Sequence, residues 1–204
     1  MVGFKWIGGA IDEEGPAHFV LGCEESHGYL VGQYARDKDG AVACLLMSEL
    51  AARLKAAGKS VHERLDELFR QHGVHTEQLL TIQMEGSEGM ARMNRLMDRF
   101  RRQPPAELGG LRVVAVRDYL AQQVRCQAET RPLPGPRGDM VMLDFAPAGN
   151  YIAVRPSGTE PKVKFYMFAY TPPEQCTDLA GATARQAARL GQLGQEVRAF
   201  VQSE

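Results

Sequence analysis

The feature that most constrains the fold is a run of four strand-like segments in the second half of the chain, with no helical pattern between them. They are short and apolar, and they cover residues 111–117, 140–145, 150–155 and 162–170. A fifth such segment, 79–84, precedes them, with one helical pattern in between, and a last helical pattern ends the chain. This order predicts an antiparallel sheet with helices on one face.

The first half of the chain shows a mixed pattern of strands and helices. The apolar segment 17–23 indicates a buried strand. Asp39 is placed to cap one helix, and Ser60 with Glu63 forms the S-x-x-E capping box of a second helix that ends at Gly73. The fold class predicted for the chain is therefore α/β in the first part and α+β in the second.

The segment 73–77 has no apolar period, and we place a domain boundary there. It separates a domain at residues 1–74 from a domain at residues 75–204. The opening of the chain, MVGFKWIGGAIDEEGPAHFVLGCEES, begins directly in a loop-like stretch with no helix or strand to anchor it, as in a segment taken from a longer protein. A short natural N-terminus is the alternative interpretation.

Local signals place the helices of the second domain. Ser87 is expected to cap the first of them, and a methionine stripe with one phenylalanine is expected to be core packing, at Met90, Met93, Met97 and Phe100. The stretch 171–174, TPPE, has the form of a capping box with proline at the first helical position of the last helix. Residues 131–139 are too rich in proline and glycine for regular structure.

Composition excludes several classes of function. The net charge is −1 over 204 residues, which gives no general attraction to nucleic acid or to an anionic membrane. No segment approaches the ~18 apolar residues that span a bilayer. The four cysteines are scattered without a CxxC pair, which favours reduced thiols and a cytoplasmic protein, with no disulfide or metal site.

The stretch RPSGTEPKVKFY, residues 155–166, indicates a phosphate-binding loop between two strands. It offers a guanidinium, backbone amides, hydroxyls and two lysines on one strand face, from Arg155, Ser157, Gly158, Thr159, Lys162 and Lys164. Glycine is expected to permit the tight turn. The alternative is a polar hairpin turn with a solvated basic edge strand. No Walker-type loop is present, so ATP is not implied.

The stretch GCEESHGY, residues 22–29, places two glutamates, Ser26 and His27 at the end of a predicted strand. Carboxylates accept hydrogen bonds from sugar hydroxyls, so Glu24 and its neighbours suit a polyhydroxylated ligand. A solvated turn is an equally good interpretation, and His27 is either a proton carrier or a turn residue. The charged stretch RDKDG, 36–40, is read as a charged turn beside a helix cap.

Taken together and in this order, GFKWIG, GCEESHGY, RDKDG and RPSGTEPKVKFY resemble the α-D-phosphohexomutase family, the phosphoglucomutases and phosphomannomutases. The four motifs span from Gly3 to Tyr166. Members have four domains around one cleft. The resemblance implies that this chain contains the later part of the third domain and the whole fourth domain, whose topology resembles that of the TATA-binding protein.

The resemblance also implies roles for particular residues. Glu24 and Ser26 match the loop that hydrogen-bonds the sugar hydroxyls, and Phe4 and Lys5 match a loop that helps to select the sugar's orientation. Lys38 matches a lysine lining the cleft. The non-transferred phosphate is expected at residues that match the fourth-domain loop, namely Arg155, Ser157, Gly158, Thr159 and Lys164.

The family moves a phosphoryl group between a phosphoserine and the sugar through a hexose 1,6-bisphosphate. Its members use Mg²⁺ and a serine loop in their first two domains, and neither a T-x-S-H-N-P-like nor a D-x-D-x-D stretch occurs here. The resemblance therefore implies no catalytic residue, metal or other cofactor in this segment, with His27 as a candidate secondary proton relay. The chain alone is predicted to be inactive.

The leading hypothesis is a C-terminal segment of a mutase that interconverts hexose 1-phosphate and hexose 6-phosphate. Its expected partners are glucose 1-phosphate, glucose 6-phosphate, glucose 1,6-bisphosphate or their mannose equivalents, and the missing N-terminal domains. The alternative is a stand-alone, non-catalytic sugar-phosphate-binding module. Nucleic-acid binding is a third idea that the near-neutral charge argues against.

Overall fold

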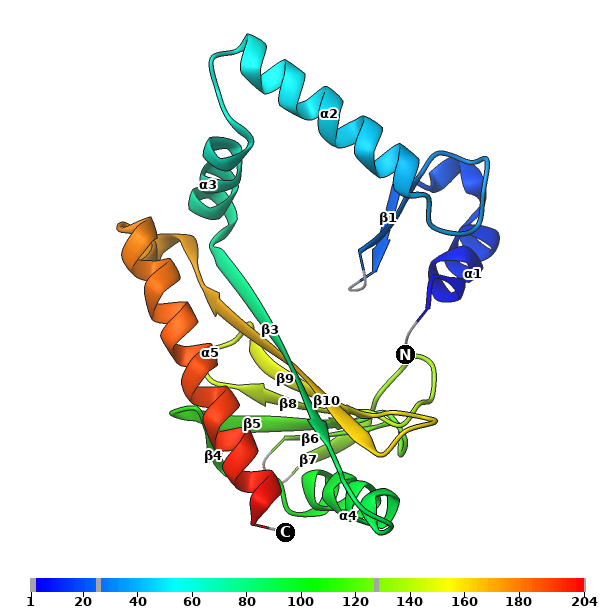
Figure 1. Ribbon diagram of the computed structural model, residues 1–204, viewed down its shortest axis with the longest axis vertical. Helices are drawn as coiled ribbons and strands as arrows, with labels where there is room; N and C mark the ends of the chain where they lie inside the picture. Colours follow the sequence, from blue (N-terminus) through cyan, green and yellow to red (C-terminus); the bar gives the residue numbers. More distant parts are fainter. Residues whose placement is uncertain (1–2, 25–26, 127–128, 204) are drawn as a thin grey trace. The chain divides into compact units, whose positions relative to one another are not determined.

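The computed structural model describes residues 3–24, 27–126 and 129–203, and its chain divides into two compact units, Met1–Glu67 and Leu68–Glu204 (Figure 1). Unit 1 combines helices with a two-stranded sheet, and unit 2 has an eight-stranded antiparallel sheet with helices. The predicted fold class is confirmed. The assignment of 1–74 and 75–204 to two family domains stays a prediction.

Unit 1 is held together by a small apolar core. Its elements are α1 (Lys5–Glu14), the single-turn helix η1 (Pro16–His18), β1 (Leu21–Glu24), β2 (Gly28–Val31) and α2 (Gly40–Ala56). The strands β1 and β2 pair antiparallel. The buried core residues are Phe4, Ile11 and Leu30, with Ile7, Phe19 and Ala35 packed against them. A two-stranded sheet is at best marginally stable alone, so this core fixes the hairpin against α1.

The opening of the chain is a helix, and the expectation of a loop was wrong. Ile7 and Ile11 are four positions apart on α1, so both face the core beside Phe4. Gly8 allows the helix to approach a neighbouring loop, because a Cβ there would lie 3.0 Å from the backbone oxygen of Arg36. The two glycines in the middle of this helix obscured its pattern in the sequence.

Both helix caps predicted for the first half are confirmed. The side chain of Asp39 accepts hydrogen bonds from the backbone N–H groups at the start of α2. For α3 (Val61–His72), which crosses the border between the units, Ser60 Oγ accepts from the N–H of Glu63 at 3.1 Å. The Glu63 carboxylate in turn accepts from the N–H of Ser60 at 2.7 Å. This is the reciprocal arrangement that a capping box requires.

The Asp39 cap predicts a pH dependence of unit 1. The Tyr34 hydroxyl, at 2.6 Å, and then the N–H groups of Ala41 and Val42 hold the pKa of Asp39 below its ordinary value of 3.8. A lowered folded-state pKa means that the cap stabilises α2 above the ordinary pKa and that this stabilisation is lost as the pH falls through the lower value. Tyr34→Phe is expected to raise the Asp39 pKa toward 3.8, as measured by NMR titration of its carboxyl carbon.

The matched control for this titration is Tyr29→Phe. Among the described residues, the Tyr29 side chain makes no hydrogen bond to Asp39, so this variant is expected to leave the Asp39 pKa unchanged. An Asp39 pKa that is the same in Tyr34→Phe as in the parent chain would contradict the assigned cause of the shift.

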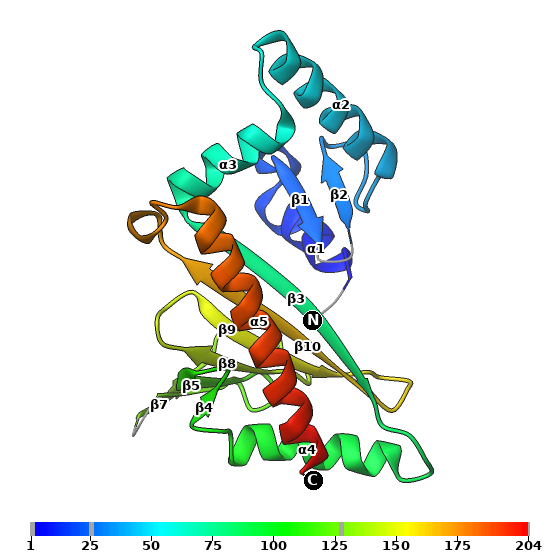
Figure 2. The ribbon, with the colours of Figure 1, turned by 60° about the vertical axis from the view of Figure 1, so that its left-hand side comes forward.

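The sheet of unit 2 has the strand order β3-β10-β9-β8-β5-β6-β7, with β4 paired to β5, and every pair is antiparallel (Figures 1 and 2). Its strands are β3 (Val74–Gln83), β4 (Glu107–Leu108), β5 (Leu111–Asp118), β6 (Gln123–Cys126), β7 (Glu129–Pro132), β8 (Val141–Phe145), β9 (Asn150–Pro156) and β10 (Lys162–Thr171). The pairing of β3 with β10 brings the first and the last strand of the unit together.

The helices α4 (Gly89–Arg102) and α5 (Leu179–Gln202) contribute to one core with a single face of this sheet. Figure 2 shows α5 running along the sheet. Burial alternates along β10, where Val163 and Phe165 are buried and Lys162 and Lys164 are half-buried on the other face. The methionine stripe is core as predicted at Met93, Met97 and Phe100, whereas Met90 is 44% exposed.

Three sequence predictions for unit 2 need correction at element ends. The strand β3 begins at Val74, not Leu79, because Val74 pairs with Thr171 of β10. Ser87 does not cap α4, whose first residue is Gly89 and whose N-cap, Glu88, makes no capping bond. The hairpin of β6 and β7 was not predicted, and β7 takes in residues 131 and 132 of the stretch expected to be irregular.

The last helix begins at Leu179 and not at the TPPE stretch. Pro173–Gln175 forms only a single turn, η2, and Asp178 caps α5 by accepting from the N–H of Gly181 at 3.0 Å. A residue before proline is disfavoured in the helical region, and Thr171 and Pro172 both precede a proline. Thr171 therefore extends β10 instead of starting a helix.

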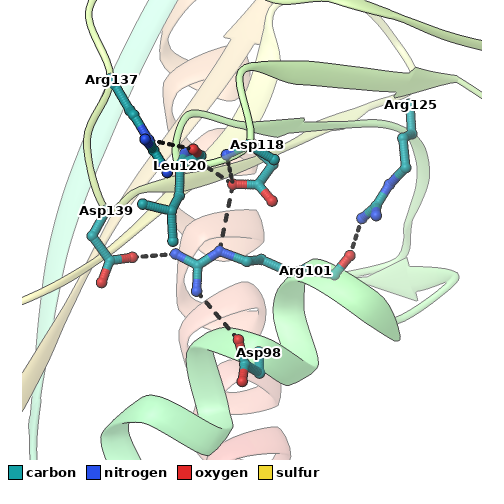
Figure 3. Close-up of polar contacts among 8 residues, drawn as sticks. Asp98, Arg101, Asp118, Leu120, Arg125, Arg137 and Asp139 are labelled. Atoms are coloured by element: carbon teal, nitrogen blue, oxygen red, sulfur yellow. Dashed lines mark hydrogen bonds and ion pairs between the residues drawn. The ribbon is translucent and has the colours of Figure 1, made fainter.

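A buried arginine fastens the C-terminal end of α4 to the segment that leads into β8 (Figure 3). Arg101 is 8% exposed, and its guanidinium faces three carboxylates, those of Asp98 at 3.6 Å, Asp118 at 3.4 Å and Asp139. Asp118 also accepts from the N–H groups that follow β5, and Arg125 donates to the backbone oxygen of Arg101. The cluster thus fixes the long 119–140 connection at both ends.

Candidate functional site

The loop between β9 and β10 presents two cations side by side. Arg155 and Lys164 are directly opposite each other in the register of the two strands, and both are half-buried on the face away from the helices. Among the described residues, neither side chain forms a hydrogen bond or an ion pair. Two adjacent and unpaired cations form a local site of positive charge suited to an anion.

The other lysine of the motif, Lys162, already has an ionic partner. Lys162 forms an ion pair with Glu160, which lies in the loop itself. Its backbone N–H donates to the Glu160 oxygen at 2.7 Å. The two lysines share a strand face, as predicted. Because only the Lys162 charge is paired, Arg155 and Lys164 are the cations that remain available to a ligand.

The backbone of the loop supplies fewer donors than the sequence suggested. The N–H of Ser157 donates to the oxygen of Lys162 at 2.8 Å, so this amide closes the hairpin and is not available to a ligand. Within the described residues, the N–H groups of Gly158, Thr159 and Glu160 donate no hydrogen bond. Three consecutive free amides beside two free cations are suited to a phosphate group.

Gly158 is not required by the geometry of the turn. Its φ angle is not positive, and a Cβ at this position would meet nothing within 4 Å. The expectation that glycine permits the tight turn is therefore wrong at this position.

Sequence reasoning missed Thr81, which lies opposite Lys164 on β3. Thr81, Lys164 and Arg155 therefore form one row across three strands, and the exposed hydroxyl of Thr81 is next to the lysine. Only the strand register brings Thr81 here, since it is far from the loop in sequence and belongs to no motif.

The predicted sugar loop lies at the turn between β1 and β2 of unit 1. Ser26 and Glu25 lie outside the described residues. The Glu24 side chain is 9% exposed, and its Oε1 lies 3.9 Å from the ammonium of Lys38, which also lies 3.1 Å from Asp37 Oδ1. Glu24 and Lys38, predicted separately from two motifs, are thus brought together by the fold.

Two further candidates in unit 1 take different positions. Phe4 is 3% exposed and belongs to the core, so its side chain packs against α1 and β2 and does not face a ligand. Lys5 is exposed, with its ammonium 5.5 Å from the centre of the Trp6 ring. His27 is exposed and has a left-handed backbone, with φ of 63°, and its N–H donates to the Glu24 oxygen at 3.1 Å. These positions leave Lys5 and His27 accessible.

Gly28 is required for the contact between Glu24 and Lys38. It lies opposite Glu24, and a Cβ there would lie 2.6 Å from Glu24 Oε1 and 2.6 Å from Lys38 Cδ. Gly28→Ala is expected to displace both side chains, with only a small loss of stability, because the atoms that a Cβ would meet belong to two flexible side chains and not to the backbone. Urea unfolding and the amide shifts of residues 24 and 38 would measure both effects.

Gly40→Ala is the matched control, because a Cβ at Gly40 would meet nothing within 4 Å. This variant is expected to keep the amide shifts of residues 24 and 38 unchanged. Equal amide shifts at residue 24 in both variants would show that the contact between Glu24 and Lys38 does not depend on the absence of a side chain at position 28.

The residues described do not fit a magnesium site. In 3–24, 27–126 and 129–203, no group of three or more His, Cys, Asp or Glu side chains is placed to hold a metal ion. Nothing in the function proposed for this chain is therefore routed through a bound ion. In the same ranges, none of the helices combines the length and apolar character that crossing a membrane requires.

Comparison with known proteins places this chain in a family. Residues 1–72 match the family model "Phosphoglucomutase/phosphomannomutase, alpha/beta/alpha domain III". The chain belongs to the phosphoglucomutase/phosphomannomutase family, the α-D-phosphohexomutases, and represents a C-terminal portion of its members. The curated relatives described next are proteins named phosphoglucomutase.

One such relative is the phosphoglucomutase of Staphylococcus haemolyticus (strain JCSC1435), which is 36% identical over 170 residues, 82% of this chain and 31% of that protein. The phosphoglucomutase of Staphylococcus epidermidis (strain ATCC 12228) is 34% identical over the same length. This chain therefore spans about a third of the length of these curated relatives.

A solved structure shares the fold. The open form of the exocytosis-sensitive phosphoprotein pp63/parafusin, a phosphoglucomutase from Paramecium, superimposes with a TM-score of 0.60 at 20% identity. The match covers 98% of this chain and 33% of that one.

Proposed function

We propose that this chain is the sugar- and phosphate-recognition part of a phosphohexomutase that interconverts hexose 1-phosphate and hexose 6-phosphate. The observation that carries the proposal is the β9–β10 loop, where Arg155 and Lys164 lie opposite each other beside three free amides. Family membership supports the reaction class, since the relatives are named phosphoglucomutases. Residues 1–74 would then be the later part of the third family domain and residues 75–204 the fourth.

The proposed phosphate ligands are the side chains of Arg155 and Lys164, the amides of Gly158 and Thr159, and the hydroxyls of Ser157 and Thr159. Each charge-assisted hydrogen bond contributes roughly 1.5–3 kcal/mol. The planar guanidinium of Arg155 can donate to two phosphate oxygens at once, which fixes the orientation of the phosphate. Such a site holds the phosphate that is not being transferred.

The proposed sugar contacts are Glu24, Ser26, Lys5 and Lys38. The Glu24 carboxylate accepts hydrogen bonds from ring hydroxyls. The Lys38 ammonium lies 3.9 Å from Glu24 Oε1 and so partly balances its charge and helps to orient it. The core position of Phe4 makes it a supporting residue of the loop that carries Lys5. The exposed imidazole of His27 is proposed as a proton relay.

The reaction proposed for the complete enzyme passes through a hexose 1,6-bisphosphate that turns over in the cleft. This segment would bind the sugar and the phosphate that is not transferred, while the phosphoserine loop and the Mg²⁺ loop belong to the N-terminal domains of the family. The sequence contains neither a T-x-S-H-N-P-like nor a D-x-D-x-D stretch. The 204-residue chain alone is therefore expected to show no mutase turnover with glucose 1-phosphate.

The test is an NMR titration of the isotope-labelled chain with inorganic phosphate, glucose 1-phosphate, glucose 6-phosphate and mannose 1-phosphate. The amides of residues 158–160 are expected to shift with all four, and the amide of residue 24 only with the sugar phosphates. Binding is expected to be weak, because ligands of a full cleft come from several domains. If millimolar phosphate leaves 158–160 unmoved, the loop assignment is wrong.

The alternative is a free-standing sugar-phosphate-binding module, favoured by the absence of the two reactive motifs from the sequence. The intact mass of the native polypeptide in its source cells separates the two. A mass well above 22.5 kDa, with peptides that carry the serine and aspartate loops, supports the mutase, and a mass near 22.5 kDa supports the module. All four cysteines are free in the structure, which supports a cytoplasmic location for either.

A further inference from the structure

A small cavity lies on unit 2 away from the phosphate loop, at the other end of the strands that carry it. Its volume is about 270 Å³, the scale of a single sugar ring. Its lining residues come from β3, β9, β10 and the turn before β9, and they are His75, Thr76, Glu77, Gly149, Tyr151, Phe168 and Ala169. We call this the aromatic pocket. It contains no residue of the predicted site.

The aromatic wall of the pocket is fixed by the strand register. Tyr151 of β9 lies opposite Phe168 of β10, and their rings stack with centroids 4.4 Å apart and planes 21° apart. Next to them, His75 and Tyr170 pack with centroids 4.5 Å apart. Gly149, with φ of +89°, allows this approach, because a Cβ there would lie 2.5 Å from the Tyr170 ring. The wall is therefore a packed aromatic surface with a polar edge.

The polar groups of the pocket are the Glu77 carboxylate and the Tyr151 phenol. Glu77 lies opposite Phe168 on the same face of the sheet and is exposed. Among the described residues, its carboxylate has no hydrogen bond or ion pair. Burial raises the pKa of Tyr151, so its phenol stays neutral at physiological pH and can donate a hydrogen bond. The pocket thus combines a free acceptor and a donor beside an aromatic surface.

The charge of the pocket argues against a phosphate. Another acid, Asp144, lies opposite Tyr151, and its carboxylate is neutralised by Arg117 through two hydrogen bonds of 2.7 and 2.6 Å. The Glu77 charge is not neutralised in this way. The Glu77 carboxylate would repel an anionic ligand, whereas it would not repel an uncharged ring with hydroxyl groups.

We propose that the aromatic pocket binds the ring of an uncharged hexopyranoside, separately from the sugar phosphate of the main site. The C–H face of such a ring packs on the Tyr151–Phe168 stack, and its hydroxyls donate to Glu77 and accept from the Tyr151 phenol. Lys164 is four positions from Phe168 along β10, roughly 13 Å at about 3.3 Å per residue, so one monosaccharide does not reach both sites. The inference does not depend on the phosphate loop.

The test is an NMR titration of the chain with methyl α-D-glucopyranoside, which carries no charge. Amides of residues 75–77, 149–151 and 168–169 are expected to shift, with a millimolar dissociation constant. Glu77→Gln is expected to weaken binding about tenfold, because it removes a charged acceptor. Glu107→Gln, which changes an exposed acid on β4 outside the pocket, is the matched control and is expected to leave binding unchanged.

Phe168→Leu tests the stacking contribution, provided that the spectrum shows a folded chain, and Glu77→Gln keeps the test decisive if that variant unfolds. No shift at these amides with the glucoside at about 100 mM would overturn the proposal, since this concentration is far above the expected millimolar dissociation constant. Shifts with tetramethylammonium but not with the glucoside would overturn it too, in favour of a cation site. Inorganic phosphate is expected to shift the amides of residues 158–160 instead, so failure of the proposed function would be seen separately.

Discussion

Arg155→Ala is expected to weaken the binding of glucose 1-phosphate by about 10- to 100-fold, the cost of one or two charge-assisted hydrogen bonds. Arg155 has no competing partner among the described residues, so its guanidinium needs to break no internal contact to bind phosphate. The same loss is expected with inorganic phosphate, because the sugar is not involved. The amide shifts of residues 158–160 during titration give the dissociation constants.

Two lysine variants form a matched pair for this experiment. Lys164→Ala is expected to weaken binding by about tenfold, whereas Lys162→Ala is expected to have a smaller effect because the Lys162 charge is already paired with Glu160. The two residues lie on the same strand and the same face. If Lys162→Ala weakens phosphate binding as much as Lys164→Ala does, the ion pair does not set which lysine is available.

Arg101→Met is expected to lower the free energy of unfolding of unit 2 by about 3 kcal/mol, because it leaves a buried carboxylate without its cation. The side chains of Arg101 and Asp118 are each 10% exposed. Asp118 keeps the hydrogen bonds from the N–H groups of Leu120 and Ala121, which is why we expect the lower end of the usual range. Urea unfolding followed by circular dichroism measures the change.

Arg102→Met is the control for this variant. Arg102 is the next residue of α4 and is exposed, so the same substitution there is expected to change stability by less than about 0.5 kcal/mol. A loss at Arg101 no larger than the loss at Arg102 would mean that the cluster of Figure 3 does not hold the 119–140 connection in place.

The elements that could be predicted from the sequence are those specified by neighbouring residues. The caps at Asp39 and Ser60 depend on bonds that span two or three positions, so they are readable directly. The β9 strand was predicted from its short apolar run, and β10 from the alternation of Lys162 and Lys164 with Val163 and Phe165. The extension of β3 back to Val74 was not readable, because polar residues occupy its exposed face and only the partner strand reveals it.

The candidate site shows the same division between local and long-range information. Residue types identified Arg155 and Lys164 as cations, but only the register shows that they lie opposite each other. The pairing of Lys162 with Glu160, the engaged amide of Ser157 and the burial of Phe4 all depend on three-dimensional contacts. No pattern in the sequence distinguishes a free lysine from a paired one two positions away.

The pairing of β3 with β10 also bears on how unit 2 is made. Gln83 pairs with Lys162, 79 positions later, and Val74 pairs with Thr171, 97 positions later. During synthesis on the ribosome, β3 therefore emerges well before its partner exists. Topologies dominated by such distant contacts fold slowly, and unpaired strands are exposed to aggregation while they wait. Because β3 stays unpaired until β10 is made, it is the strand that chaperones can bind for the longest time. Folding of this unit is expected to finish only after Thr171 has left the ribosome.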